Sequence, residues 1–200
     1  MFLSDPPAIR QPLSPSEFTA LIDRHQGALY RFLRGLLTNT EQARDLAQDI
    51  FHDAWRVACR SETPFIQDGS PESMRAWLFQ AAYHKAISAL RRQKLIRWES
   101  LEISHEREPE VFSTTITFES DLAEREALRA ALDRLAPQDV ACLLLRHVHG
   151  FSPTQISEMI GGSPAQVSKR LAHAKQRLRR VYLAQESATE HVPVKKDSRR

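Results

Sequence analysis

The sequence predicts an all-α protein made of two small helical domains, and three features lead to this expectation. Glycine occurs only 6 times in 200 residues, while residues that favour helices, such as alanine, leucine, arginine and glutamate, are common. Runs of β-branched residues, which favour strands, are scarce. Apolar residues recur at intervals of three and four in two parts of the chain, and an acidic stretch without this period separates the two parts.

The first helix is expected to begin near Ser16. Residues 1–15 are rich in proline, which disfavours the helix interior, and are expected to form a flexible leader. From Ser16 a single apolar stripe continues to about Leu37 and comprises Phe18, Leu21, Ile22, His25, Ala28, Leu29, Phe32 and Leu36. This stripe predicts a core helix.

Two further long helices complete the predicted N-terminal domain, residues 16–97. Thr38 followed by Glu41 predicts a capping box at the start of the second helix, whose polar side carries Arg44, Asp45, Gln48, Asp49, His52 and Arg56. Ser70 with Pro71 predicts the start of the third helix, because serine caps helices and proline is tolerated at the first helical position. The inward residues of this third helix are expected to be Met74, Trp77, Leu78, Ala81, Ala86 and Leu90. Its last turns carry Arg91, Arg92, Lys94 and Arg97, which suit a helix C-terminus.

An interdomain linker is expected over residues 98–120, where the periodicity fails and Pro109 lies among several glutamates. A second helical domain follows over residues 121–183 and begins with an apolar stripe of Leu122, Leu128, Ala131, Leu132 and Leu135. The polar tail, residues 184–200, is expected to be disordered.

The basic residues are clustered along the chain. The net charge is only +3 at pH 7, but arginine and lysine gather near residues 91–97 and 167–180, which favours polyanionic partners. No signal peptide or membrane-spanning run is present, so we expect a cytoplasmic protein with no direct membrane insertion. The 2 cysteines, Cys59 and Cys142, lack metal-type spacing and fit a reducing compartment.

No catalytic or cofactor-binding motif occurs in the sequence. A P-loop, an HExxH motif and a nucleophile elbow are all missing. Cys142, His147 and His149 are close enough in sequence to suggest zinc, but the two histidines point to different helix faces and Cys142 lies in an apolar run. We therefore expect no enzyme activity, no cofactor and no metal.

The strongest functional pattern lies between Gln138 and Tyr182 and predicts a helix-turn-helix. A first segment, residues 140–149, is apolar at Val140, Leu143, Leu144 and Val148, and it stops at Gly150, a residue suited to a left-handed position. A second segment starts at Ser152-Pro153, and Gly161-Gly162 then provides the positive φ angles of a tight turn. A third segment begins at Ser163-Pro164 and keeps Val167, Leu171, Ala174, Leu178 and Val181 on one face.

The rest of the third segment is basic and has the character of a DNA-recognition helix. In such a motif the N-terminal part of the last helix enters the major groove. The predicted contacts to base edges or phosphates are Gln166, Ser168, Lys169, Arg170, His173, Lys175 and Arg177. A charge run alone is more often a solvated exterior, but the preceding helix and the Gly-Gly turn favour the DNA-binding interpretation.

The same residues resemble the fourth region of extracytoplasmic-function sigma factors. The similarity is carried by residues 135–139, residues 145–152, Gln155-Ile156-Ser157 and residues 167–174. The resemblance implies binding to the minus-35 promoter element. Ala165-Gln166 and Ser168 depart from the Gly-Thr and the basic residue that are usual in the family, which leaves the preferred DNA sequence open.

The N-terminal helices resemble the second region of the same family, through residues 43–51 and 54–56 on one helix and residues 73–82 with 90–92 on the next. The resemblance implies that the first of these helices binds the clamp helices of the largest RNA polymerase subunit through Arg44, Asp45, Gln48, Asp49 and His52. It implies that the second helix helps to read and melt the minus-10 element, with candidate contacts at Phe65, Trp77, Gln80, His84, Arg91 and Arg92. Phe65 stacks on an extruded base or anchors its own loop, and both interpretations stay open. His84 and Ser88 replace the asparagine and aspartate common in the family.

Taken with the resemblance, the sequence predicts an alternative sigma factor. The implied partners are core RNA polymerase, through its clamp helices and flap, promoter DNA and an anti-sigma factor. The alternative is a stand-alone helix-turn-helix regulator whose N-terminal domain senses a ligand or dimerises. Co-purification with core polymerase would separate these two functions.

Overall fold

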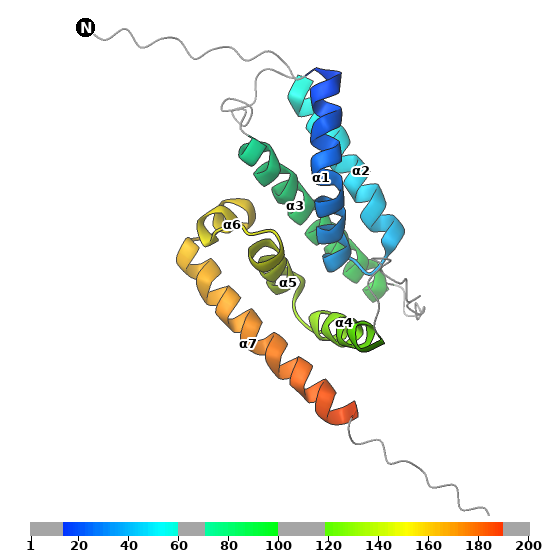
Figure 1. Ribbon diagram of the computed structural model, residues 1–200, viewed down its shortest axis with the longest axis vertical. Coiled ribbons are helices and arrows are strands. Elements are labelled where there is room, and N and C mark those ends of the chain that lie inside the picture. The colour runs from blue at the N-terminus through cyan, green and yellow to red at the C-terminus, as the bar shows by residue number, and fades with distance from the viewer. Residues whose placement is uncertain (1–13, 60–70, 100–118, 190–200) are drawn as a thin grey trace, which may run out of the picture.

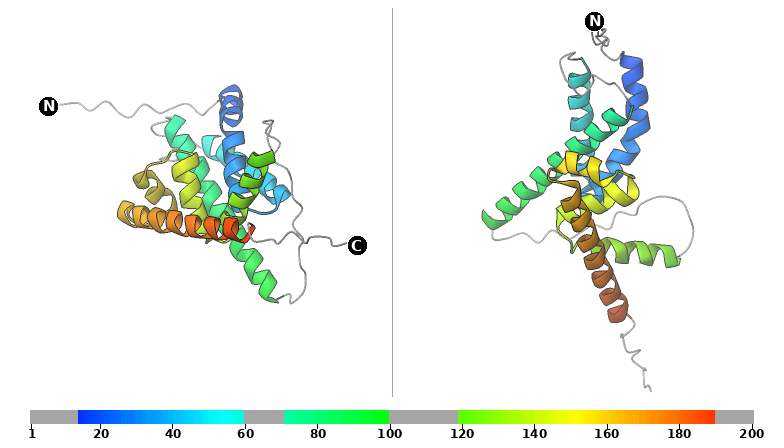
Figure 2. Two further views of the ribbon diagram at one scale, coloured as in Figure 1. Left: turned by 60° about the horizontal axis from the view of Figure 1, so that its bottom comes forward. Right: turned by 90° about the vertical axis from the view of Figure 1, so that its left-hand side faces the viewer.

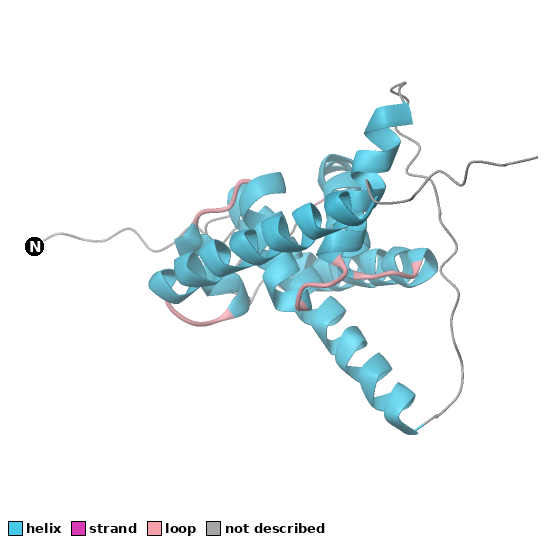
Figure 3. Ribbon diagram, turned by 90° about the horizontal axis from the view of Figure 1, so that it is seen from below, coloured by secondary structure: helices cyan, strands magenta, loops and turns pink. Residues whose placement is uncertain are grey.

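The computed structural model describes residues 14–59, 71–99 and 119–189, and every regular element in these ranges is helical (Figure 3). The described residues leave out Phe65, with the loop predicted around it, and most of the predicted leader, linker and tail. The elements in chain order are α1 (Pro15–Leu36), α2 (Thr40–Cys59), α3 (Pro71–Glu99), α4 (Glu119–Leu132), α5 (Pro137–Leu143), the π-helix η2 (Leu144–Val148), α6 (Pro153–Ile160) and α7 (Pro164–Thr189).

Helices α1, α2 and α3 pack side by side as an N-terminal bundle (Figure 1). Its core is made of large side chains with no exposed surface, including Leu29, Phe32 and Ile50. The bundle begins earlier than the sequence suggested, because Ser14 and Glu17 form a capping box and Pro15 occupies the first turn of α1. Proline is tolerated there since the first-turn N–H has no partner within the helix.

Helix α2 is capped by a different residue from the one predicted. Asn39 Oδ1 accepts a hydrogen bond from the backbone N–H of Gln42 at 2.9 Å, and α2 begins at Thr40. The prediction that Thr38 caps this helix is therefore wrong. The pattern was ambiguous because Thr38, Asn39 and Thr40 are all good capping residues.

Helices α4, α5, α6 and α7, together with η2, form a C-terminal unit in which α4, α5 and α6 all pack on α7. Gly150 has a φ angle of +75°, as expected for the residue that ends the first segment of the motif. The predicted stripes are not uniformly buried: Leu128 is 43% exposed and Val148 is 59% exposed. Helix α7 also runs to Thr189, past the predicted end near Leu183.

The N-terminal bundle and the C-terminal unit pack directly on each other, which the sequence did not predict. Helix α6 lies along α3, and α5 contacts α1, so α5 and α6 stand between the bundle and α7 (Figures 1 and 2). A Cβ at Gly35 in α1 would collide with a methyl group of Leu144 in η2, so the Leu144 side chain fills the space that the glycine leaves open. The buried residues of both parts belong to one continuous apolar cluster.

Candidate functional site

The turn between α6 and α7 has the geometry of a helix-turn-helix. Ser152 and Gln155 form a capping box at the start of α6. Gly161 and Gly162 have φ angles of +85° and +99°, which side chains other than glycine rarely adopt. The two helices are therefore separate rods that meet at a fixed angle, as the sequence predicted, rather than one continuous helix.

Helix α7 has one apolar side and one basic side. Val167 is 2% exposed and Ala174 is fully buried against the preceding helices. The rest of the helix surface, which we call the basic face, is exposed to solvent except for the half-buried Arg170 and consists of Lys169, Arg170, His173, Lys175, Arg177, Arg179 and Arg180. Ser168, also a predicted contact, is exposed, and its hydroxyl donates to the carbonyl of Pro164 at 2.9 Å.

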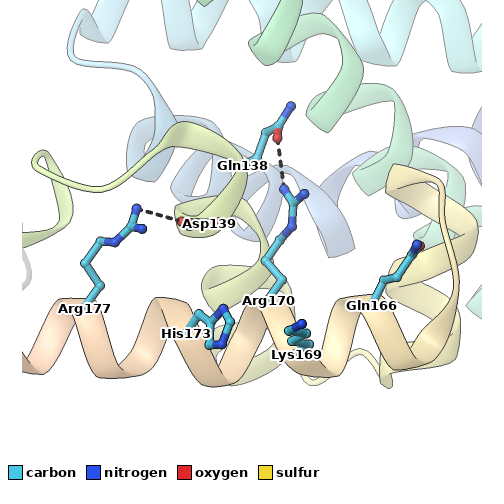
Figure 4. A pocket seen from close by; sticks show the side chains of 7 residues that line it. All are labelled: Gln138, Asp139, Gln166, Lys169, Arg170, His173 and Arg177. Carbon is cyan, nitrogen blue, oxygen red and sulfur yellow. Dashed lines mark hydrogen bonds and ion pairs between the residues drawn. The ribbon is translucent and has the colours of Figure 1, made fainter.

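Two arginines of the basic face reach back to α5 (Figure 4). Arg170 Nη1 donates a hydrogen bond to Gln138 Oε1 at 2.9 Å, and Arg177 Nη1 lies 3.5 Å from Asp139 Oδ2. The sequence did not single out Gln138 or Asp139 as contacts, because only the placement of α5 beside α7 brings them to the site.

Gln166 has a structural task in addition to its predicted one. Its Oε1 accepts from the backbone N–H of Ser163 at 2.9 Å, and its own N–H donates to Ser163 Oγ at 3.3 Å. This reciprocal pair is a capping box at the start of α7. The side chain is exposed, so it remains accessible beside the basic face.

A second group of predicted residues lies along α2. Arg44, Gln48 and His52 are four residues apart, and Asp45 and Asp49 follow the same interval, so the five lie on one side of the helix. All five are exposed. They form what we call the α2 strip, and Asp53, next to it, is tied to Lys85 of α3 by an ion pair at 2.9 Å.

The third group, on α3, is not uniformly accessible. His84, Arg91 and Arg92 are exposed, whereas Trp77 and Gln80 are half-buried. Gln80 Nε2 donates to the backbone carbonyl of Glu158 in α6 at 3.4 Å. Phe65, the remaining predicted contact of this group, lies outside the described residues.

The contact between the two parts of the molecule is built around His149 and Phe151, which follow η2. Arg75 of α3 donates to the backbone carbonyl of His149, and its guanidinium lies 4.2 Å from the centre of the Phe151 ring. The Phe79 ring is 4.4 Å from the His149 ring and 5.2 Å from the Phe151 ring. A cation over an aromatic face and tilted ring pairs are both favourable arrangements.

Burial holds His149 in its neutral form. The side chain is 8% exposed, and its Nε2 finds no hydrogen-bond partner among the described residues. Desolvation lowers the pKa of His149 to about 4, and the nearby charges of Arg75 and Arg31 add to the effect. His147, two residues earlier, is exposed on the other side of the chain.

Cys142 is a core residue of the C-terminal unit. It is fully buried, and desolvation raises the pKa of its thiol to about 11, so the group is a neutral thiol at physiological pH. Within the described ranges no cluster of histidine, cysteine and acidic residues has the arrangement of a metal site. None of the helices described is long and apolar enough to cross a bilayer.

Both parts of the chain match models of one protein family. The model for sigma-70 region 2 matches residues 21–96, which include the α2 strip and α3. The model for sigma-70 region 4 matches residues 125–178, which include the helix-turn-helix.

The chain is also similar in sequence to named bacterial sigma factors. The chain is 28% identical to the ECF RNA polymerase sigma factor SigE of Mycolicibacterium smegmatis over 84% of this chain, and the alignment spans 62% of SigE, less than two thirds of its length. It is 28% identical to the RNA polymerase sigma factor YlaC of Bacillus subtilis, over 70% of this chain and 77% of YlaC. It is 26% identical to the ECF sigma factor SigL of Mycobacterium tuberculosis, over 80% of this chain and 85% of SigL.

A solved structure has a similar fold. The sigma factor RpoE, in a complex with the anti-sigma factor NepR from Bartonella quintana, superposes with a TM-score of 0.65 at 20% identity. The match covers 83% of this chain and 96% of that one.

Proposed function

Because the chain belongs to the sigma-70 family, in its extracytoplasmic-function group, we propose that it binds core RNA polymerase and directs it to a specific class of promoters. The observation that carries this proposal is the basic face of α7, held outward by a helix-turn-helix whose other side is packed on the rest of the protein. Helices presented in this way enter the major groove of duplex DNA.

Each group of predicted residues has its own task in this proposal. The basic face binds the upstream promoter element. The α2 strip binds the polymerase clamp, since a mixed, exposed set of charges on a rigid helix suits a specific and electrostatically complementary interface. His84, Arg91 and Arg92 on α3 contact the downstream element, and the catalysis of RNA synthesis belongs to the polymerase.

We propose that the two parts of the protein separate for the downstream task. Gln80, one of the proposed downstream contacts, is half-buried and donates to the carbonyl of Glu158 in α6. Its amide has to leave this carbonyl before it binds a base, and a movement of α6 away from α3 would free it. We therefore assign the packed arrangement to the free protein and a more open one to the promoter complex.

An anti-sigma factor is the proposed regulatory partner. The similar RpoE structure contains the anti-sigma factor NepR. A protein that holds the N-terminal bundle and the C-terminal unit together would keep Gln80 covered. Co-purification of the chain from its native source would identify this anti-sigma partner.

The proposal is tested by in vitro transcription with core polymerase and the full chain on a library of genomic fragments. Promoter-specific transcripts are expected only when the chain is present.

Arg170→Ala is expected to reduce promoter binding and leave polymerase association intact, whereas Asp45→Ala is expected to reduce polymerase association. Gln176→Ala, on an exposed position of α7, is the matched control. A chain that binds a DNA operator but never co-purifies with core polymerase would contradict the proposal and support a stand-alone regulator.

The salt dependence of promoter binding gives an independent check of the electrostatic part. If about six cations of the chain each neutralise a phosphate, affinity should fall by about three orders of magnitude between 50 and 200 mM salt. An affinity that does not change with salt would exclude the basic face as the DNA contact.

A further inference from the structure

A recess lies between the first turn of α5 and the side of α7 that carries Arg170 and Arg177 (Figure 4). Its volume is about 370 Å³, and its lining residues are Gln138, Asp139, Gln166, Lys169, Arg170, His173 and Arg177. All the lining residues from α7 are proposed upstream DNA contacts. Gln138 and Asp139 come from α5 and have no assigned task.

Gln138 holds the side chain of Arg170 without changing its charge. Arg170 Nη1 donates to Gln138 Oε1 at 2.9 Å, and Arg170 is half-buried beside it. A guanidinium has five N–H donors, so four remain for a ligand after this bond. The bond also fixes a long flexible side chain before DNA arrives, which lowers the entropy cost of binding.

Asp139 forms an ion pair with Arg177, whereas Gln138 is a neutral hydrogen-bond acceptor for Arg170. The Asp139 side chain is 18% exposed and the Arg177 side chain 56% exposed, with 3.5 Å between Oδ2 and Nη1. A carboxylate at this distance orients the guanidinium but also offsets its charge. Asp139 is the one acidic residue among those that line the recess, and it repels any phosphate that enters.

The two arginines also occupy different parts of α7. Arg170 lies in the N-terminal part of the helix, which in a helix-turn-helix meets base edges, and arginine to guanine is the commonest specific contact in the major groove. Arg177 lies about two turns further along, where contacts to the DNA backbone are expected.

We propose that Gln138 and Asp139 are positioning residues of the upstream DNA site. Gln138 presents a fully charged Arg170 to a base edge and so contributes to sequence specificity. Asp139 restrains Arg177 and weakens its attraction for phosphates in general, so that binding to wrong sequences stays low. This inference rests on the proposed function and deepens it.

The test uses the full chain assembled with core polymerase, a fluorescent duplex carrying the selected promoter, and a scrambled duplex of equal length. Gln138→Ala is expected to weaken promoter binding about tenfold, within the range for loss of one bidentate base contact, and to leave binding to the scrambled duplex unchanged. In an Arg170→Ala background the same substitution should have no further effect, because the two residues act as one unit.

Asp139→Asn is expected to act on both duplexes. Binding to promoter and scrambled DNA should tighten by similar factors of about three or more, and the slope of log affinity against log salt should steepen by about 0.9 as Arg177 gains a phosphate. Asp139→Glu, which keeps the charge, should restore wild-type behaviour. Gln176→Ala and Glu126→Gln are controls that lie outside the recess.

The outcomes separate this inference from the function on which it rests. If Gln138→Ala weakens both duplexes equally, or Asp139→Asn leaves the salt slope unchanged, the positioning roles are overturned while promoter binding by the wild-type chain stands. If the wild-type chain with core polymerase does not distinguish promoter from scrambled DNA, or Arg170→Ala has no effect, both the inference and the upstream site are wrong. Thermal unfolding of each variant shows that the fold is retained.

Discussion

The C-terminal unit has two faces with opposite chemistry, although they belong to the same small group of helices. Its inner face, at η2 and α6, is apolar and places His149 and Phe151 in the core of the molecule. Its outer face, on α7, exposes a row of cations. The inner face contributes stability and the outer face is free to bind, so substitutions on the two sides should change different measurements.

The largest expected effect is on stability, from Phe151→Ala. Phe151 is 2% exposed and packs on Phe79 with the guanidinium of Arg75 above it. Removing a buried ring leaves a cavity, and the free energy of unfolding should fall by about 3–5 kcal/mol, measured by urea denaturation. Val148→Ala, at a position that is 59% exposed, should change it by less than about 0.5 kcal/mol. Equal effects of the two substitutions would show that the inner face is not packed in this way.

The next effect is a dependence of stability on pH that comes from His149. The pKa of His149 is lowered from 6.5 to about 4 in the folded protein, mainly by burial, so the unfolded chain binds the proton more readily. The contribution of His149 to the free energy of unfolding is therefore fully present above pH 6.5. It is lost as the pH falls to about 4, which lowers the free energy of unfolding by up to roughly 3 kcal/mol.

His149→Gln should remove this part of the pH dependence in urea titrations repeated between pH 4 and 7. The exposed His147, changed to Gln, is the matched control and should keep the wild-type profile. If the His149 variant also keeps that profile, the imidazole is accessible to water and the inner face opens readily.

A smaller effect is expected at Gly35 in α1. Alanine is a better helix former than glycine by about 1 kcal/mol, but a Cβ at this position would collide with Leu144 of η2. We expect Gly35→Ala to destabilise the protein by about 1–2 kcal/mol, and Leu144→Ala to relieve the clash in the double variant.

Gly27→Ala, in the same helix, provides the control. A Cβ there would lie 3.3 Å from the tip of Arg31, which can move aside, so this substitution should stabilise the protein by up to about 1 kcal/mol. Stabilisation by both substitutions would mean that the Leu144 side chain moves aside and does not pack tightly on Gly35.

The smallest effect on stability is expected on the outer face. Lys175 is exposed on α7, and Lys175→Ala should change the free energy of unfolding by less than about 0.5 kcal/mol. The same substitution should reduce the salt slope of promoter binding by about 0.9 if the ammonium group neutralises one phosphate. A large loss of stability here would show that the outer face is also structural.

Local patterns were enough to predict most of the helices and the two breaks between them at Gly150 and at Gly161-Gly162. The turn at Gly161-Gly162 and the cap at Ser163 follow from chemistry within a few residues, because only glycine adopts these φ angles easily and a serine side chain caps its own helix. The cap of α2 was assigned to the wrong residue where three neighbouring residues were all suitable. The exposure of Leu128 and Val148 was missed because periodicity shows which residues share a helix face and not what covers that face.

By itself, the sequence determined the all-α class, the order of the helices, the α2 strip and the basic face of α7, since these depend on interactions between residues close together in the chain. Only the tertiary structure decided that the N-terminal bundle and the C-terminal unit pack on each other around His149 and Phe151, and that Gln138 and Asp139 lie beside Arg170 and Arg177. Those contacts join residues far apart in sequence, and their formation depends on how whole apolar surfaces fit together, which no local spacing of residues records.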